Sequence, residues 1–166
     1  MLCRHAIHMK RVSPSFCARL VPLVILALGL PALAGNRAGG TTEEARAMLL
    51  KAIDHYKSVG RQQALADFTA KRPPFADRDL YVLCFSPDRT VIANGAFPSA
   101  VGTNGDVVID VNGRGVATSA RNATSAGGNG VVQYRWVNPL TRTVETKIAF
   151  FARVGDDVCG VGTYSP

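Results

Sequence analysis

The stretch Val131–Tyr164, VVQYRWVNPLTRTVETKIAFFARVGDDVCGVGTY, predicts three consecutive β-strands joined by two tight turns. Its apolar runs are rich in β-branched and aromatic side chains, which favour extended backbone. Asn138-Pro139 and Gly155-Asp156 interrupt these runs with residues typical of turns. Because connections this short cannot cross over a sheet, we expect the strands to pair antiparallel. They are expected at residues 131–137, 144–154 and 158–164.

The residues before this stretch predict two more strands and a helical N-terminal part. Leu80–Phe85 and Thr90–Ala93 are short apolar runs separated by a Pro-Asp turn sequence. Apolar residues recur at spacings of three and four over residues 42–59, which indicates an amphipathic helix, and a second helical segment follows at 61–70. An alanine-rich helix is expected within 114–125. The sequence therefore predicts an α+β domain with a long N-terminal helix and a sheet of about five antiparallel strands.

Residues 1–34 have the three-part pattern of a secretory signal peptide. Basic side chains come first, an apolar run from Leu20 to Leu30 follows, and Ala32-Leu33-Ala34 has the small residues of a cleavage site. We predict cleavage near Ala34, which would leave a periplasmic or secreted protein. The alternative is an inner-membrane anchor formed by residues 20–34. As a helix this segment spans about 22 Å, whereas the hydrocarbon core is about 30 Å thick.

This pattern divides the chain into three parts. Residues 1–34 are the predicted signal peptide, residues 35–41 are a flexible lead-in, and residues 42–164 form one domain. The whole sequence has 19 Lys and Arg against 12 Asp and Glu, a formal net charge of +7. Four of the basic residues and none of the acidic ones lie in the first 34 positions, so the remainder carries +3. This modest charge argues against a nucleic-acid partner.

Two cysteines, Cys84 and Cys159, remain beyond the predicted signal peptide, and both lie in predicted strands. In an oxidising compartment they can form a disulfide if the strands are neighbours and the Cβ atoms lie about 4 Å apart. The alternative is a pair of separate buried thiols, because free cysteine packs as a small hydrophobic residue. The sequence leaves both open.

The predicted domain has few residues suited to catalysis or metal binding. His55 is its only histidine and lies on the long helix, so we expect no zinc site. The sequence has no phosphate-binding glycine loop and no nucleophile-elbow serine. Asp77 and Asp79 precede a strand, where solvated charges are common. We therefore predict no catalytic residue, no metal and no cofactor; turnover that depends on Asp77 or Asp79 would indicate an enzyme instead.

A candidate binding site lies in the last third of the chain. Tyr134 and Trp136 share one face of a predicted strand, and Arg135 points to the other. A hairpin through Asn138-Pro139 would place Lys147 beside them. Two aromatic rings with polar edges and one ammonium group suit a small carboxylate, because the rings exclude water and the cation neutralises the anion. The alternative is that the rings belong to the core and Lys147 extends to solvent.

A set of short motifs together resembles the single Cache domain, type 2, a PAS-like extracytoplasmic sensor module. The motifs are Asp79–Val82, Val91–Gly95, Gly102, Asp110–Gly113, Tyr134–Pro139, Lys147 and Gly160–Tyr164. The resemblance covers about residues 42–164. It implies a long N-terminal helix laid across a five-stranded antiparallel sheet, with a ligand on the other face under the middle loops and helix.

The resemblance also implies a small-molecule ligand, often a short carboxylate, bound by Tyr134, Trp136 and Lys147, with Arg135 as a further candidate. Because no signalling domain follows Pro166, we expect the module to act with a membrane sensor or receptor partner. Phe150 stands where such domains often have tyrosine, and Phe97 where asparagine is common, which would remove polar groups from the pocket. The alternative function is therefore a structural module, a homodimer through the long helix, with a degenerate pocket. The sequence does not name the ligand or partner.

Overall fold

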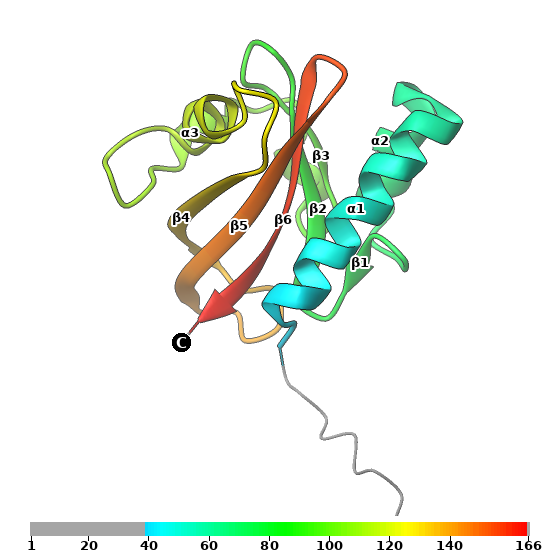
Figure 1. The fold of residues 1–166 in the computed structure, drawn as a ribbon. Coiled ribbons are helices and arrows are strands. Elements are labelled where there is room, and N and C mark those ends of the chain that lie inside the picture. The colour runs from blue at the N-terminus through cyan, green and yellow to red at the C-terminus, as the bar shows by residue number, and fades with distance from the viewer. Residues whose placement is uncertain (1–38, 166) are drawn as a thin grey trace, which may run out of the picture. The chain divides into compact units, whose positions relative to one another are not determined.

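The computed structural model describes residues 39–165 (Figure 1). The predicted signal peptide and the rival anchor lie outside these residues. The elements are α1 (Thr42–Val59), α2 (Arg61–Thr69), β1 (Ala76–Asp77), β2 (Leu80–Phe85), β3 (Val91–Asn94), the 3₁₀ turns η1 (Pro98–Ala100) and η2 (Gly105–Val107), α3 (Val116–Ala123), β4 (Gly130–Val137), β5 (Val144–Val154) and β6 (Asp157–Ser165). None of the helices in this part of the chain has the length and hydropathy to span a membrane.

The strands form one antiparallel sheet in the order β1-β2-β6-β5-β4, and β3 pairs with β2. The expected α+β fold with a long N-terminal helix is confirmed. The sheet has six strands rather than five because Ala76–Asp77 pairs with the start of β2. A two-residue strand is too short to show the alternation of apolar and polar residues by which strands are recognised in a sequence.

The two faces of the sheet have different covers. Helices α1 and α2 lie against one face, and α3 lies on the other side (Figure 1). Side chains that alternate along each strand divide between two clusters of buried apolar residues. The face under α1 and α2, called here the helix face, includes Leu80, Val82, Cys84, Phe150 and Val161. The opposite face, called here the cavity face, includes Tyr81, Leu83, Phe85, Tyr134 and Phe151.

Helix α1 begins and ends at clear sequence signals. The Thr41 side chain accepts a hydrogen bond from the Glu44 amide, and the Glu44 carboxylate accepts one from the Thr41 amide, which forms a capping box. Gly60 ends the helix with φ 83°, a conformation that glycine adopts without steric cost. The buried face of α1 consists of Ala45, Met48, Leu49 and Ala52.

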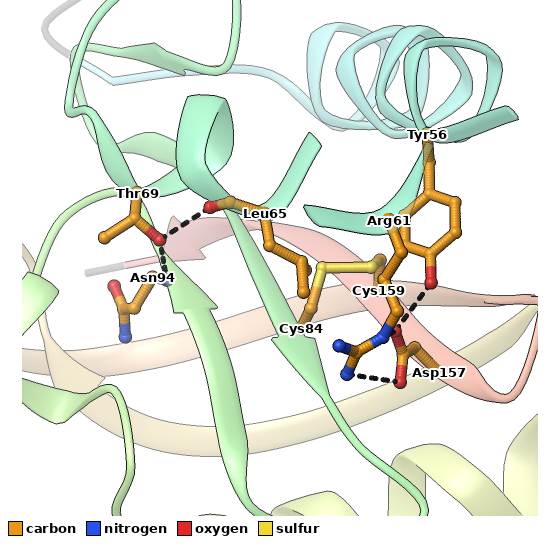
Figure 2. The surroundings of a disulfide bond; sticks show 8 residues. All are labelled: Tyr56, Arg61, Leu65, Thr69, Cys84, Asn94, Asp157 and Cys159. Carbon is orange, nitrogen blue, oxygen red and sulfur yellow. Dashed lines mark hydrogen bonds and ion pairs between the residues drawn. A yellow bond between two sulfur atoms is a disulfide. The ribbon is translucent and has the colours of Figure 1, made fainter. Parts of the chain in front are cut away.

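A disulfide bond joins Cys84 of β2 to Cys159 of β6, which are directly opposite in the strand register. Both cysteines are buried on the helix face. Figure 2 shows a polar cluster beside them, in which Asp157 accepts hydrogen bonds from the Tyr56 hydroxyl at 2.7 Å and from Arg61 Nε at 2.8 Å. Burial and the Asp157 carboxylate raise the pKa of Tyr56 to about 12, so this hydroxyl remains a donor. The disulfide bond thus joins β2 to β6, and the hydrogen bonds from Tyr56 and Arg61 to Asp157 connect α1 and α2 to β6.

Candidate ligand site

A cavity of about 50 Å³ lies between the cavity face of the sheet and the segment from η1 to α3. Strands β2, β3 and β4 supply one wall, and residues between Ala100 and Val116 supply the other. Most of its surface is apolar. The apolar side chains include Leu83, Phe85, Val91, Val108 and Val116. None of the described residues that line the cavity carries a charge.

Aromatic rings with polar edges form part of the wall. Tyr81, Tyr134 and Trp136 all line the cavity. The Phe97 ring packs edge-on against Tyr81 and Trp136, with ring centres 6.0 and 5.9 Å apart. The Tyr134 hydroxyl makes no hydrogen bond with another described residue. Burial holds the pKa of Tyr134 well above its usual range, so the hydroxyl stays protonated and can donate a hydrogen bond to a ligand.

Lys147 on β5 lies directly opposite Tyr134 on β4 and is buried, with 1 % of its surface exposed. Its Nζ is 3.6 Å from the centre of the Tyr81 ring and 3.3 Å from the Tyr164 hydroxyl. The backbone of Gly162 makes room for this side chain, because a Cβ there would lie 2.6 Å from Lys147 Cε. Distant parts of the chain thus enclose the amino group among aromatic rings.

The amino group of Lys147 lacks a nearby counter-charge. Within the described residues, no carboxylate lies within 4.0 Å of its Nζ, as the ion pairs of the structure show. Burial lowers the pKa of Lys147 well below its usual range, and the negative charge of Asp79 opposes this only in part. Asp79 is itself buried and accepts a 2.6 Å hydrogen bond from the Gly40 amide. An anion bound beside Lys147 would therefore stabilise its ammonium form.

The structure brings some of the sequence-predicted residues together and separates others. Tyr134 and Trp136 line the cavity, whereas Lys147 contacts its aromatic wall through Tyr81 and is not among the lining residues. Arg135 is exposed on the other face of β4 and donates a hydrogen bond to the Val144 carbonyl, so it does not reach the cavity. The direct contact partners of Lys147 are thus Tyr81 and Tyr164 rather than Tyr134 and Trp136.

Phe150 corrects an expectation drawn from the family resemblance. It lies on the helix face, with the Arg46 guanidinium 4.0 Å above its ring. Lys147 and Phe150 are three positions apart on one strand, so their side chains point to opposite faces. A phenylalanine at position 150 therefore removes no hydroxyl from the cavity, and this argument for a degenerate pocket is lost. Phe97, by contrast, packs on the cavity's aromatic wall as described above.

Tyr81 and Tyr164 contact Lys147, and neither was among the candidate site residues predicted from the sequence. Every residue of β2 is buried, so the alternation that would assign Tyr81 to one face is absent from the sequence. Tyr164 lies in the Gly160–Tyr164 motif, where alternation with Gly160 and Gly162 places it on the same face as those glycines. This alternation could have assigned Tyr164 to a face of the sheet, but it could not show that the Tyr164 hydroxyl lies beside Lys147.

A sheet with two helices on one face and a small covered cavity on the other is the arrangement of a PAS-like fold. The family model named Single Cache domain 2 matches residues 39–163, and the chain belongs to this family. Cache domains are sensory domains.

Solved structures show the same fold at low sequence identity. The methyl-accepting chemotaxis protein from Vibrio parahaemolyticus RIMD 2210633 is 20% identical, with a TM-score of 0.59 over 74% of this chain and 86% of its own. A structure described as the "structural basis for carboxylic acid recognition by a Cache chemosensory domain" is 18% identical, with a TM-score of 0.60 over 75% and 92%. A periplasmic sensor domain of a chemotaxis protein is 21% identical, with a TM-score of 0.56 over 75% and 90%. A search of proteins with curated functions finds no match.

Proposed function

We propose that this protein is an exported sensor module that binds a small monocarboxylate and acts together with a membrane sensor or receptor partner. The observation that carries the proposal is the buried amino group of Lys147, which has no carboxylate within 4.0 Å among the described residues and lies against the aromatic wall of the cavity. Burying a basic group without a counter-charge costs stability, and a bound carboxylate would offset that cost.

The cavity supports a small ligand with one charge. A water molecule needs about 10 to 15 Å³ of such space, so this cavity suits a molecule of about three to five non-hydrogen atoms. Among the described residues that line it, none is a cation that could pair with a second carboxylate, and none is a carboxylate that could pair with an amino group. Acetate and propionate fit these conditions, and succinate and alanine do not.

The carboxylate and the hydrocarbon part of the ligand would contact different residues. The carboxylate would form an ion pair with Lys147 and accept a hydrogen bond from the Tyr134 hydroxyl. A rotation of the Tyr81 ring would connect the Nζ of Lys147 with the cavity, because this ring contacts both. The hydrocarbon part would lie against apolar side chains such as Leu83 and Val116.

The predicted signal peptide and the family together support an extracytoplasmic location. Two of the similar structures belong to chemotaxis proteins, and one of these is a periplasmic sensor domain. We propose cleavage near Ala34 and binding of the mature domain to a receptor partner. Mass spectrometry of the exported protein tests the cleavage site, because a retained anchor would leave residues 20–34 in the measured mass.

The experiment for the ligand class is calorimetric titration with acetate, propionate, succinate and alanine, supported by melting curves. We expect the two monocarboxylates to bind and to raise the melting temperature, since a ligand that binds only the folded state stabilises it. Succinate and alanine are expected to have no effect at the same concentrations. Binding of alanine with no response to acetate would contradict the proposal.

Carboxylate affinity is expected to decrease as the pH rises. Burial keeps the pKa of Lys147 low in the free protein, and an adjacent carboxylate raises it in the complex, so binding takes up a proton between these two pKa values. In that range the dissociation constant should increase about tenfold per pH unit, and below it the affinity should be constant. Burial raises the pKa values of Tyr81, Tyr134 and Tyr164, so these neighbours stay neutral there, while Asp79 supplies the negative charge that acts on Lys147.

Calorimetry of acetate binding in two buffers with different ionisation enthalpies measures this proton uptake directly. A binding enthalpy that is identical in the two buffers throughout the neutral and alkaline range would show that Lys147 does not change its protonation on binding.

A further inference from the structure

The Tyr164 hydroxyl is the centre of a hydrogen-bond network on the cavity face. It lies 3.3 Å from Lys147 Nζ, 3.1 Å from the Tyr81 hydroxyl and 3.0 Å from the carbonyl oxygen of Val137. These partners come from β5, β2 and the end of β4, while Tyr164 belongs to β6. One hydroxyl therefore connects four strands at the point where Lys147 is buried.

The number of protons and lone pairs determines the direction of each hydrogen bond. A tyrosine hydroxyl donates one hydrogen and accepts through its lone pairs. The Val137 carbonyl can only accept, so Tyr164 donates its hydrogen there. The remaining bonds must then run toward Tyr164, with the Tyr81 hydroxyl and the Lys147 amino group as donors. With these three bonds the Tyr164 hydroxyl has no donor left for a ligand.

We propose that Tyr164 is a positioning residue, whose saturated hydroxyl holds the amino group of Lys147 against the Tyr81 ring, beside the proposed carboxylate site, without touching the ligand itself. This inference rests on the ligand-binding role proposed for Lys147. The rings of Tyr81 and Tyr164 enclose the Lys147 amino group, with ring centres 3.6 and 4.7 Å from Nζ, but a ring face does not fix the direction of an N–H bond. Among the described residues, the hydrogen bond that gives Lys147 Nζ a direction is the one to the Tyr164 hydroxyl.

The same geometry separates the three tyrosines by function. The hydrogen of Tyr81 is committed to Tyr164, and the hydrogen of Tyr164 to Val137. Tyr134 is the tyrosine of the cavity whose hydroxyl bonds no other described residue. The geometry therefore makes Tyr134 the hydroxyl that can donate to the ligand, and Tyr164 the one that orients the cation.

Tyr164→Phe tests the proposal with acetate as the probe. We expect the affinity for acetate to fall about tenfold, because Lys147 loses the acceptor that orients it. The midpoint of the Lys147 titration in the ligand-free protein, followed by ¹³C NMR of its Cε, is expected to move to lower pH, because a hydrogen bond accepted from the ammonium favours the charged form. A loss of general stability alone would not produce this second change.

Tyr56→Phe is the matched control. It removes a hydroxyl that donates to Asp157 on the helix face, away from the Lys147 site. Both variants should lose stability, but Tyr56→Phe should leave the acetate affinity and the Lys147 midpoint unchanged. An unchanged midpoint in Tyr164→Phe would overturn the positioning role.

Two outcomes separate this inference from the proposed function. If the wild-type protein binds no monocarboxylate while the Lys147 midpoint still moves in Tyr164→Phe, the proposed ligand is wrong and the contact between the two residues stands. If Tyr164→Phe does not fold, the ¹³Cζ resonance of Tyr164 in the wild-type protein supplies the test. This resonance should titrate with the midpoint of Lys147, and its independence of Lys147 would overturn the inference.

Discussion

Lys147→Met should abolish detectable carboxylate binding and, at the same time, stabilise the ligand-free domain. Methionine has a similar length and needs no hydrogen bond, so it can fill the space over Gly162 without burying an amino group. The affinity for acetate should fall at least about 30-fold, because truncating one partner of a buried charge pair costs about 2 to 5 kcal/mol. The melting temperature should rise by a few degrees, since burying an incompletely bonded polar group costs about 1 to 3 kcal/mol.

Lys51→Met is the control for this experiment. Lys51 is exposed on α1, on the other side of the sheet, so the same substitution there should change neither the affinity nor the melting temperature by much. The informative result for Lys147→Met is that the acetate affinity should fall while the melting temperature rises. A residue kept only for stability would lower the melting temperature when replaced, and a drop in melting temperature with acetate binding intact would contradict the proposed site.

The sequence was sufficient for the fold because the deciding signals are local. The short turns between the last three strands require antiparallel pairing, and the Thr41 capping box and Gly60 bound the first helix. The six-residue strand Leu80–Phe85 was equally clear from its composition. The two-residue strand Ala76–Asp77 was missed because its pairing depends on the tertiary position of β2 and not on its own residues.

The site was predictable only in part because its central feature is made by residues distant in sequence. Strand alternation placed Tyr134 and Trp136 on one face and Arg135 on the other, and the structure has this arrangement. The burial of Lys147 depends on Tyr81, on Tyr164 and on the missing side chain at Gly162, and none of these contacts follows from the sequence around Lys147.

Phe150 shows how the alternation of side chains between the two faces of a strand can correct an argument from family resemblance. The substitution of tyrosine by phenylalanine was expected to remove a donor from the pocket, on the basis of the residue type alone. Counting along β5 from Lys147 places position 150 on the helix face, where the structure finds it. A functional interpretation of a substitution in a strand therefore needs the face of the residue as well as its identity.

Reducing the disulfide bond is expected to lower the free energy of unfolding by about 4 kcal/mol, since Cys84 and Cys159 are separated by 75 positions and a loop of this length restricts the unfolded chain strongly. Urea unfolding of the oxidised protein, of the reduced protein and of a Cys84→Ala, Cys159→Ala double variant measures the loss. The double variant should be somewhat less stable than the reduced protein, because it also loses two buried sulfur atoms.

The proposed carboxylate site should survive this change in the reduced, still folded protein. The disulfide lies on the helix face, whereas Tyr81 and Tyr164 project from the same two strands onto the cavity face. Backbone pairing between β2 and β6, from Val82 opposite Val161 to Phe85 opposite Val158, keeps these strands together without the covalent bond. Acetate affinity in the reduced protein should therefore equal that of the oxidised protein. A large loss of affinity under conditions where the protein remains folded would instead show that the bond maintains the position of Lys147's aromatic neighbours.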